Sequence, residues 1–346
     1  MWIGRIIGKY IHRVRKILLQ SGIDGFLTLL LVAVALAWLW PAAGAGEGIF
    51  SLSSLANYGV SIIFFFYGLK LNRQKLHTDL GNLHLHILIH FTTFVFFPIL
   101  ILGIRPLFHG EDYNLLWLGI FYLAALPSTV SSSVVMVSIA RGNIPAAIFN
   151  ASISSLIGVF ITPLWMSLFL SSATEMNTAG LWSIIGKLVL QILLPVALGM
   201  ALNPRWGAFA EKRRHALRMF DQSIILLIVY TSFCASFAHH LFEGFSRMVL
   251  LGCVAGMVLL FFIVFGFVGL LCRCFRMNRE DTITAQFCSS KKSLVHGTAM
   301  SKVIFAGYSS IGVILLPVML YHALQLMIVS AIARKKAGIN QMEIVR

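Results

Sequence analysis

The sequence carries little charge for its length. Asp, Glu, Lys and Arg together make up 11% of the 346 residues, whereas a soluble domain carries about 25%. So few charges cannot cover the surface of an ordinary soluble protein, and that class is excluded. The 58% hydrophobic content also excludes an intrinsically disordered chain, which requires low hydrophobicity.

Cysteine is also scarce. Five cysteines in 346 residues are too few, and odd in number, for a disulfide-stapled scaffold. A membrane β-barrel would show weak alternation with a period of two, not long unbroken apolar runs. The class that remains is an all-α membrane protein, in agreement with a mean hydropathy of +0.87.

Ten apolar runs follow one another along the chain. A hydrocarbon core of roughly 30 Å needs about 20 helical residues, so we interpret each run as a transmembrane helix. The predicted spans are 24–41, 52–70, 81–103, 114–139, 144–170, 181–202, 221–240, 248–271, 281–304 and 309–333.

The positive charges lie mainly on one side of these spans. Most of the 27 Lys and Arg precede the first span, follow an even-numbered span or lie in the tail. The positive-inside rule therefore predicts an integral membrane protein with both termini cytoplasmic, and we expect it in the bacterial inner membrane. The lipid bilayer accounts for the net charge of +15, and nucleic acid is not expected as a partner.

The two ends of the chain lie outside the predicted spans. Residues 1–22 alternate basic and apolar side chains at helical spacing, which predicts an amphipathic helix on the cytoplasmic face. A removed transit peptide is the alternative for this segment. Residues 335–346 are predicted to form a cytoplasmic tail.

Carboxylates are absent from the middle of every predicted span. All 12 Asp and Glu lie in loops or at span ends. Polar groups inside a span are costly and are functional candidates by default. A cation site here would therefore have to use hydroxyls, amides and backbone carbonyls.

Two polar stretches interrupt the apolar pattern instead. They are Pro127–Ser133 and Gln286–Ser293, and each lies in the fourth span of a five-span half. The halves, 23–172 and 173–334, would insert in opposite orientations. Corresponding interrupted helices are the best sequence indication of a transporter site. The alternative is that the hydroxyls merely bond back to carbonyls of their own helix.

Two lysines lie inside the second interruption. Lys291 and Lys292 follow Glu280 by more than ten residues, and ten helical residues span about 15 Å, so snorkelling to the membrane surface would be difficult. An ammonium at this depth could neutralise carbonyl dipoles in place of a bound sodium ion and attract an anion. We favour Lys291 as the lysine that faces the cavity.

The predicted substrate-binding residues come from both interruptions and from the polar faces of spans five and ten. No catalytic residue and no metal ligand is assigned, because the pair His86 and His90 more often faces headgroups or a neighbouring helix than a metal. The predicted set is Ser131, Ser132, Ser133, Asn150, Gln286, Ser289, Ser290, Lys291, Lys292 and Gln325.

Three stretches carry a resemblance to a known family. Ala140-Arg141-Gly142-Asn143 leading to Ile161-Thr162-Pro163, and Pro317 leading to Tyr321–Gln325, resemble the bile acid:sodium symporter family, solute carrier family 10. The run Phe287–Leu294 is similar to the seventh-member branch and its bacterial relatives.

The resemblance implies ten helices in two inverted five-helix repeats, with broken crossing helices four and nine. Spans 1, 2, 6 and 7 would form a panel domain, and spans 3–5 and 8–10 a core domain. It further implies that a small, amphipathic organic anion is moved by alternating access.

The sodium ligands of that family are largely replaced in this sequence. Val134, Ala147, Ala151 and Gln286 stand where its sodium-coupled members carry oxygen ligands, and few ligands remain for a hard cation. We therefore expect no cofactor, and uptake that changes little when potassium replaces sodium. Sodium coupling through backbone carbonyls is the alternative.

Three functions remain open at this point. The first is a secondary active transporter of an organic anion. The second is a non-transporting membrane regulator of calcium homeostasis on the same fold, as is associated with the seventh-member branch. The third, an intramembrane enzyme acting on lipid, would need a nucleophile with a base in reach. No such pair occurs at a diagnostic spacing, so we expect that the protein is not an enzyme.

Overall fold

The computed structural model describes residues 25–44, 46, 51–70, 82–108, 111–173, 186, 189–243, 245–306 and 308–338. The amphipathic helix predicted for residues 1–22 and the end of the predicted tail lie outside these residues. Every regular element in the described part is a helix, and it contains no strand. Six helices there are long and apolar enough to span a membrane: Leu52–Lys70, Leu83–Leu107, Ile144–Phe169, Arg214–Ala238, Arg247–Cys274 and Ile311–Ala337.

The first half of the chain contains ten helical elements in its described part. Two are irregular: a π-helix η1 and a short 3-10 helix η2. In chain order they are α2 (Gly25–Leu39), α3 (Pro41–Gly44), α4 (Leu52–Lys70), α6 (Leu83–Phe91), η1 (Thr92–Phe96), α7 (Phe97–Gly103), η2 (Arg105–Leu107), α8 (Glu111–Ala125), α9 (Ser131–Ile139) and α10 (Ile144–Ala173).

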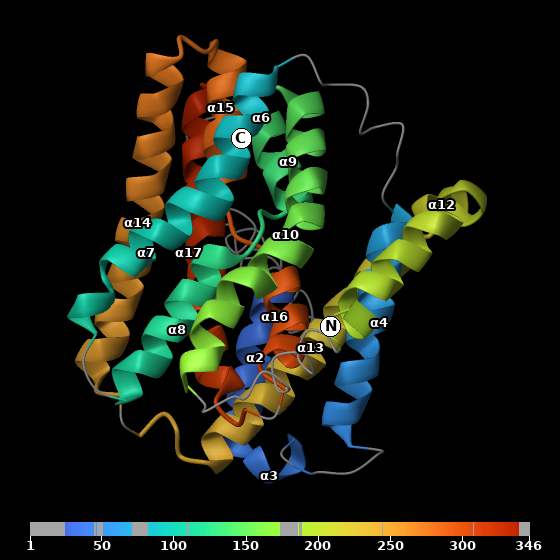
Figure 1. Ribbon diagram of the computed structural model, residues 1–346, viewed down its shortest axis with the longest axis vertical. Coiled ribbons are helices and arrows are strands. Elements are labelled where there is room, and N and C mark those ends of the chain that lie inside the picture. The colour runs from blue at the N-terminus through green and yellow to red at the C-terminus, as the bar shows by residue number, and fades with distance from the viewer. Residues whose placement is uncertain are drawn as a thin grey trace, which may run out of the picture.

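The second half begins, in its described part, with another π-helix. The elements are η3 (Val189–Leu193), α12 (Leu194–Lys212), α13 (Arg214–Ala238), α14 (Arg247–Cys274), α15 (Arg279–Ser289), α16 (Leu294–Ile304) and α17 (Ile311–Ala337). Figure 1 shows α14, α15 and α17 beside one another, and α4 beside α12.

Both expected interruptions are present, but they are shorter than the polar stretches. Residues 126–130 separate α8 from α9, and residues 290–293 separate α15 from α16. The first polar stretch extends to Ser133, but helix α9 already begins at Ser131, so the break lies close to Ser131 as expected. Likewise, Gln286 lies within α15. Polar composition marks the neighbourhood of a break, whereas the break itself depends on which backbone groups find other partners.

The helices of spans six and seven extend beyond their apolar runs. Helix α12 continues past 202 to Lys212, and α13 begins at Arg214, before 221. Hydropathy marks where apolar side chains stop, whereas Lys and Arg favour helix formation and extend both helices beyond their apolar runs.

Helices α4, α12 and α13 form one packed group. A Cβ on Gly68 would lie 2.2 Å from the carbonyl oxygen of Val196, so only glycine permits this approach of α4 to α12. The Lys70 ammonium lies 2.9 Å from a carboxylate oxygen of Asp221 and joins α4 to α13. Helices α2 and α3 also contact α13.

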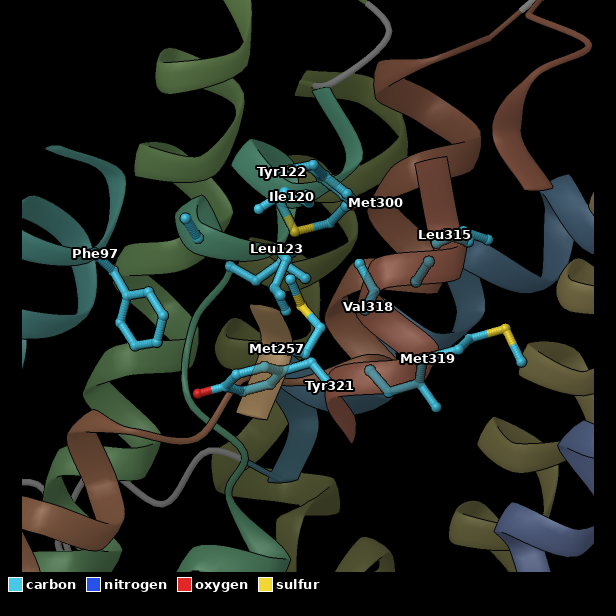
Figure 2. Packing of buried hydrophobic residues seen from close by; sticks show 14 of the residues in the cluster. Phe97, Ile120, Tyr122, Leu123, Met257, Met300, Leu315, Val318, Met319 and Tyr321 are labelled. Carbon is cyan, nitrogen blue, oxygen red and sulfur yellow. The ribbon is translucent and has the colours of Figure 1, made fainter. Parts of the chain in front are cut away.

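A second group of helices surrounds the two interruptions. Helix α8 contacts α17, α14 contacts α15 and α17, and α15 contacts α6 and α9. Their buried apolar side chains, among them Phe97, Tyr122, Met257 and Tyr321, form the core shown in Figure 2. The interruptions are thus polar segments enclosed by an apolar bundle.

Candidate functional site

The first interruption ends α8 because its backbone groups bind partners from other helices. In a continued helix the Ser128 N–H would donate to Ala124, but it donates to Ser154 Oγ at 3.0 Å. Pro127 has no N–H to donate. The Ala125 carbonyl accepts a hydrogen bond of 2.8 Å from Thr162 Oγ1. Buried backbone groups need partners, and α10 supplies two of them here.

A glycine allows α10 to come this close. A Cβ on Gly158 would lie 2.6 Å from both Cβ and Cγ of Pro127. No side chain fits at that distance, so the proline of the interruption packs directly against the α10 backbone.

The second interruption is held by two side chains of α17. Gln325 bonds both peptide groups of Lys292: its Oε1 accepts from the Lys292 N–H, and its Nε2 donates to the Lys292 carbonyl, both at 2.8 Å. The Tyr321 hydroxyl donates to the Ser290 carbonyl at 2.6 Å. In Figure 2 the hydroxyl oxygen of Tyr321 points toward the side on which Phe97 lies.

The two interruptions contact each other directly. The Ser293 N–H donates to the Pro127 carbonyl at 2.9 Å. Ser293 is also the N-cap of α16, because its hydroxyl accepts from the His296 N–H. Segments separated by more than 160 residues therefore form one polar centre.

The ammonium of Lys292 is enclosed by three backbone carbonyls. Its Nζ lies 2.8 Å from the Thr93 oxygen, 2.6 Å from Ala124 and 2.8 Å from Leu126. A lysine has three N–H donors, so this group is completely hydrogen-bonded. The Nζ also lies 4.1 Å from the centre of the Phe97 ring, which is within range of a cation–π contact.

The local sequence explains why the Thr93 carbonyl is free to accept. In the π-helix η1 the Phe97 N–H bonds to Thr92 instead of Thr93. The residue that would follow in the π pattern is Pro98, which has no N–H. Thr93 is therefore left without a backbone donor, and Lys292 supplies one.

Lys291 lies in a different environment, although it is equally buried. Its relative exposure is 0%, against 1% for Lys292. Its Nζ donates to Ser132 Oγ at 2.6 Å, and this is its hydrogen-bond partner among the described side chains. Ser132 in turn donates to Thr129 Oγ1 at 2.9 Å, which lies 3.2 Å from Ser133 Oγ.

No carboxylate compensates either lysine within the described part of the chain, where the ion pairs all involve other residues. For Lys292 the three carbonyl dipoles take that role. Lys291 has one hydroxyl, that of Ser132, as its described partner. A buried charge is costly unless it is paired and hydrogen-bonded, and among the described residues the Lys291 ammonium has no negative partner.

Helix α9 begins beside Lys291, since Ser132 is in its first turn. Its N-cap is Val130, and no described side chain caps it. The first N–H groups of a helix lack intrahelical partners and carry positive potential. Two buried hydroxyls, on Ser128 in the first interruption and on Ser289 at the end of α15, also have no partner among the described residues. Together these groups offer donors with no acceptor.

The other predicted site residues are placed as follows. Asn150 is buried in α10, where it donates to the Ala146 carbonyl and lies 3.1 Å from His86 Nδ1. Gln286 bonds the Phe265 carbonyl and Lys336. Neither side chain shares a described hydrogen bond with Lys291 or Lys292. Ser290 bonds back to the Gln286 carbonyl at 2.6 Å, and the side chain of Ser131 is outside the described part.

Sequence reasoning missed a polar cluster at the start of α15. The buried carboxylate of Asp281 accepts hydrogen bonds of 2.8 Å from the amides of Asn82, Asn143 and Asn278. The first precedes α6, the second precedes α10 and the third precedes α15. Asn at the residue before a helix is a recognisable cap signal, but the sequence does not show that the caps converge.

Paired interrupted helices that meet inside a bundle of membrane-spanning helices are typical of secondary transporters. This is the class that the fold and the site define.

Comparison with known proteins identifies the family. The sequence model of the SBF-like CPA transporter family (DUF4137) matches residues 24–337, and the chain belongs to this family, which is of the bile acid:sodium symporter type. The protein is thus an integral membrane protein of a transporter family.

Three relatives match over almost their whole length. An uncharacterized protein of Pseudomonas aeruginosa is 40% identical over 315 residues, 91% of this chain and 93% of the relative. The Escherichia coli protein YfeH is 33% identical over 320 residues, 90% and 92% of the two chains. Sodium/bile acid cotransporter 7 of Rattus norvegicus is 30% identical over 329 residues, 94% and 93%.

Proposed function

We propose that the protein is a secondary active transporter of an amphipathic organic anion, which binds between Lys291 and the N-terminus of α9. The observation that carries this proposal is the buried Lys291 ammonium, whose described partner is one hydroxyl and which no described carboxylate compensates. An anion would supply the missing charge. It would also accept from the uncapped amides of α9, an arrangement that favours anions at helix N-termini.

The hydroxyls of Thr129, Ser132 and Ser133 would orient the anionic group. They form a hydrogen-bonded row that ends on Lys291. A hydroxyl can rotate to donate or accept, so the row can satisfy Lys291 without ligand and turn toward the ligand when it binds. The name of the rat relative, a sodium/bile acid cotransporter, supports an amphipathic anion as the class of substrate.

The proposed architecture of the protein is ten transmembrane helices in two inverted repeats, with both termini cytoplasmic. Alternating access would move the group formed by α4, α12 and α13 against the helices around the interruptions. One link between the two is the Tyr67 hydroxyl of α4, which donates to the Ser152 carbonyl of α10 at 3.1 Å. The Tyr67 ring packs edge-on against His296 of α16, 5.2 Å away. Ser236 of α13 adds hydrogen bonds to the Ser309 carbonyl and from the Gly312 N–H at the start of α17, and such a movement would have to exchange them.

The test is a binding screen followed by transport. Purified protein would be heated with amphipathic carboxylates and sulfonates, including taurocholate, and with uncharged alcohols and esters of the same skeletons. We expect some anions, and not their uncharged analogues, to raise the melting temperature, and those anions to accumulate in proteoliposomes.

Two variants assign that binding to the site. Lys291→Met should lose it, whereas Arg273→Ala, at the exposed end of α14, should keep it. Binding that survives in Lys291→Met would refute the proposed site. Binding without uptake would refute transport and favour a regulatory role.

A further inference from the structure

A second, separate feature of the centre is the shape of the Lys292 environment. Three carbonyl oxygens from η1, α8 and the first interruption converge on one point, 2.6 to 2.8 Å from Nζ. Rings of backbone carbonyls are the ligands with which potassium channels replace an ion's water shell. The same set of atoms would coordinate a small monovalent cation if the lysine were absent.

Two of the three carbonyls lack a helical donor because of the local backbone. A π-helix followed by Pro98 leaves Thr93 without a donor, and the diversion of the Ser128 N–H to Ser154 leaves Ala124 without one. The oxygens are therefore committed to a cation or another external donor. The face of the Phe97 ring, 4.1 Å away, adds negative potential on the same side.

The lysine itself is positioned from outside this cluster. Gln325 fixes both peptide groups of Lys292, so α17 holds the backbone from which the side chain extends, and the three carbonyls bind its end. The Nζ is thus delivered to an oxygen cluster that other elements build.

We propose that these carbonyls form a monovalent cation site which the chain occupies permanently with its own Lys292 ammonium. The protein then needs no dissolved cation at this position. The site joins η1, α8 and the interruption in the absence of sodium, and it holds them together in every step of a transport cycle. A cation that dissociates would release them once per cycle. This inference concerns stability and cation dependence, and it stands whether or not the anion proposal is correct.

The test replaces the tethered cation by a free one. Lys292→Ala removes three methylenes and the ammonium, so n-propylammonium has the size and charge of what is lost. Lys292→Met removes the charge but fills the space, and serves as the matched control. The measurement is the melting temperature in potassium, sodium, n-propylammonium and N-methylglucamine chlorides at equal ionic strength.

We expect n-propylammonium, and to a smaller extent potassium or sodium, to raise the melting temperature of Lys292→Ala by about 3 °C or more, since a ligand that binds only the folded state stabilises it. Lys292→Met and the wild type should respond equally to all four salts. A Lys292→Ala variant that is folded but insensitive to every small cation would overturn the proposal.

If Lys292→Ala yields no folded protein in any salt, the melting temperature of the wild type tests the proposal instead. An unchanged melting temperature in sodium, potassium and N-methylglucamine chlorides then supports the proposal. A saturable rise that is specific for sodium would contradict it.

Discussion

Lys291 and Lys292 are neighbours in the chain and equally buried, yet their ammonium groups have opposite surroundings. Lys292 donates to three carbonyls and faces an aromatic ring. Lys291 donates to a single described hydroxyl beside an uncapped helix. Burial alone therefore does not distinguish a structural cation from one that awaits a ligand. The number of hydrogen bonds already made does.

The difference arises from the interrupted backbone between them. Ser290 is held by Tyr321 and Lys292 by Gln325, which aims successive side chains at different helices. One ammonium crosses to α8 and η1, and the other reaches α9.

The largest effect is expected for Lys292→Met. The variant leaves three buried carbonyls without a donor, and each such group costs about 1–3 kcal/mol. We expect the free energy of unfolding to fall by several kcal/mol, measured by denaturant or thermal unfolding in detergent. Lys302→Met, in α16, is the control, since its Nζ has one long hydrogen bond, of 3.4 Å, to Ser53. Equal stability of Lys292→Met and wild type would show that the carbonyls do not need the ammonium.

The next effect is expected for Gln325→Met, which keeps the length of the side chain but removes both hydrogen bonds to the Lys292 peptide. The free energy of unfolding should fall by about 2 kcal/mol. Because Gln325 and Lys292 hold the same segment, their effects should not add in the double variant. If the two losses of stability add in the double variant, Gln325 does not position Lys292.

For Lys291→Met we expect the opposite pattern. An uncompensated buried charge is replaced by an apolar side chain of similar volume, which is often neutral or stabilising. Stability should change by less than about 1 kcal/mol, while affinity for an organic anion found in the screen should fall at least about tenfold, or 1.4 kcal/mol. Calorimetric titration of the folded variant measures the anion affinity and thus the size of the loss. A variant that unfolds easily but binds normally would reverse the roles assigned to the two lysines.

The smallest effect is expected for Ser132→Ala. It removes the described hydrogen-bond partner of Lys291 and one orienting hydroxyl, but leaves the ammonium in place. Anion affinity should weaken several-fold, in line with one hydrogen bond of about 1 kcal/mol. Ser152→Ala is the matched control, because the described partner of that hydroxyl is the Ile148 carbonyl of its own helix, α10. If Ser132→Ala and Ser152→Ala bind the anion with equal affinity, Ser132 is not part of the site.

Much of the fold could be predicted from the sequence, because hydropathy and the two polar stretches follow directly from the cost of polar groups in a membrane. The interruptions, with Lys291, Lys292 and Gln325 beside them, were found in this way. Their joint contact was also expected, from the family resemblance.

The partners of the lysines could not be predicted. The Thr93 carbonyl is available only because η1 is a π-helix, and a π-helix has no clear sequence pattern apart from the nearby Pro98. Asn150 and Gln286 were assigned to the site from their polarity, yet Asn150 bonds within α10 and to His86 of α6, and Gln286 bonds to α14 and α17. Polarity in a span identifies a group that needs a partner, but it does not say which partner it finds.

The most direct test is uptake into proteoliposomes by wild type and Lys291→Met, using an organic anion from the binding screen and equal amounts of folded protein. The proposed mechanism predicts concentrative uptake by the wild type that is abolished in Lys291→Met, although the variant melts at the wild-type temperature. Uptake by Lys291→Met at the wild-type rate would contradict the assignment of Lys291 as the anion-binding residue.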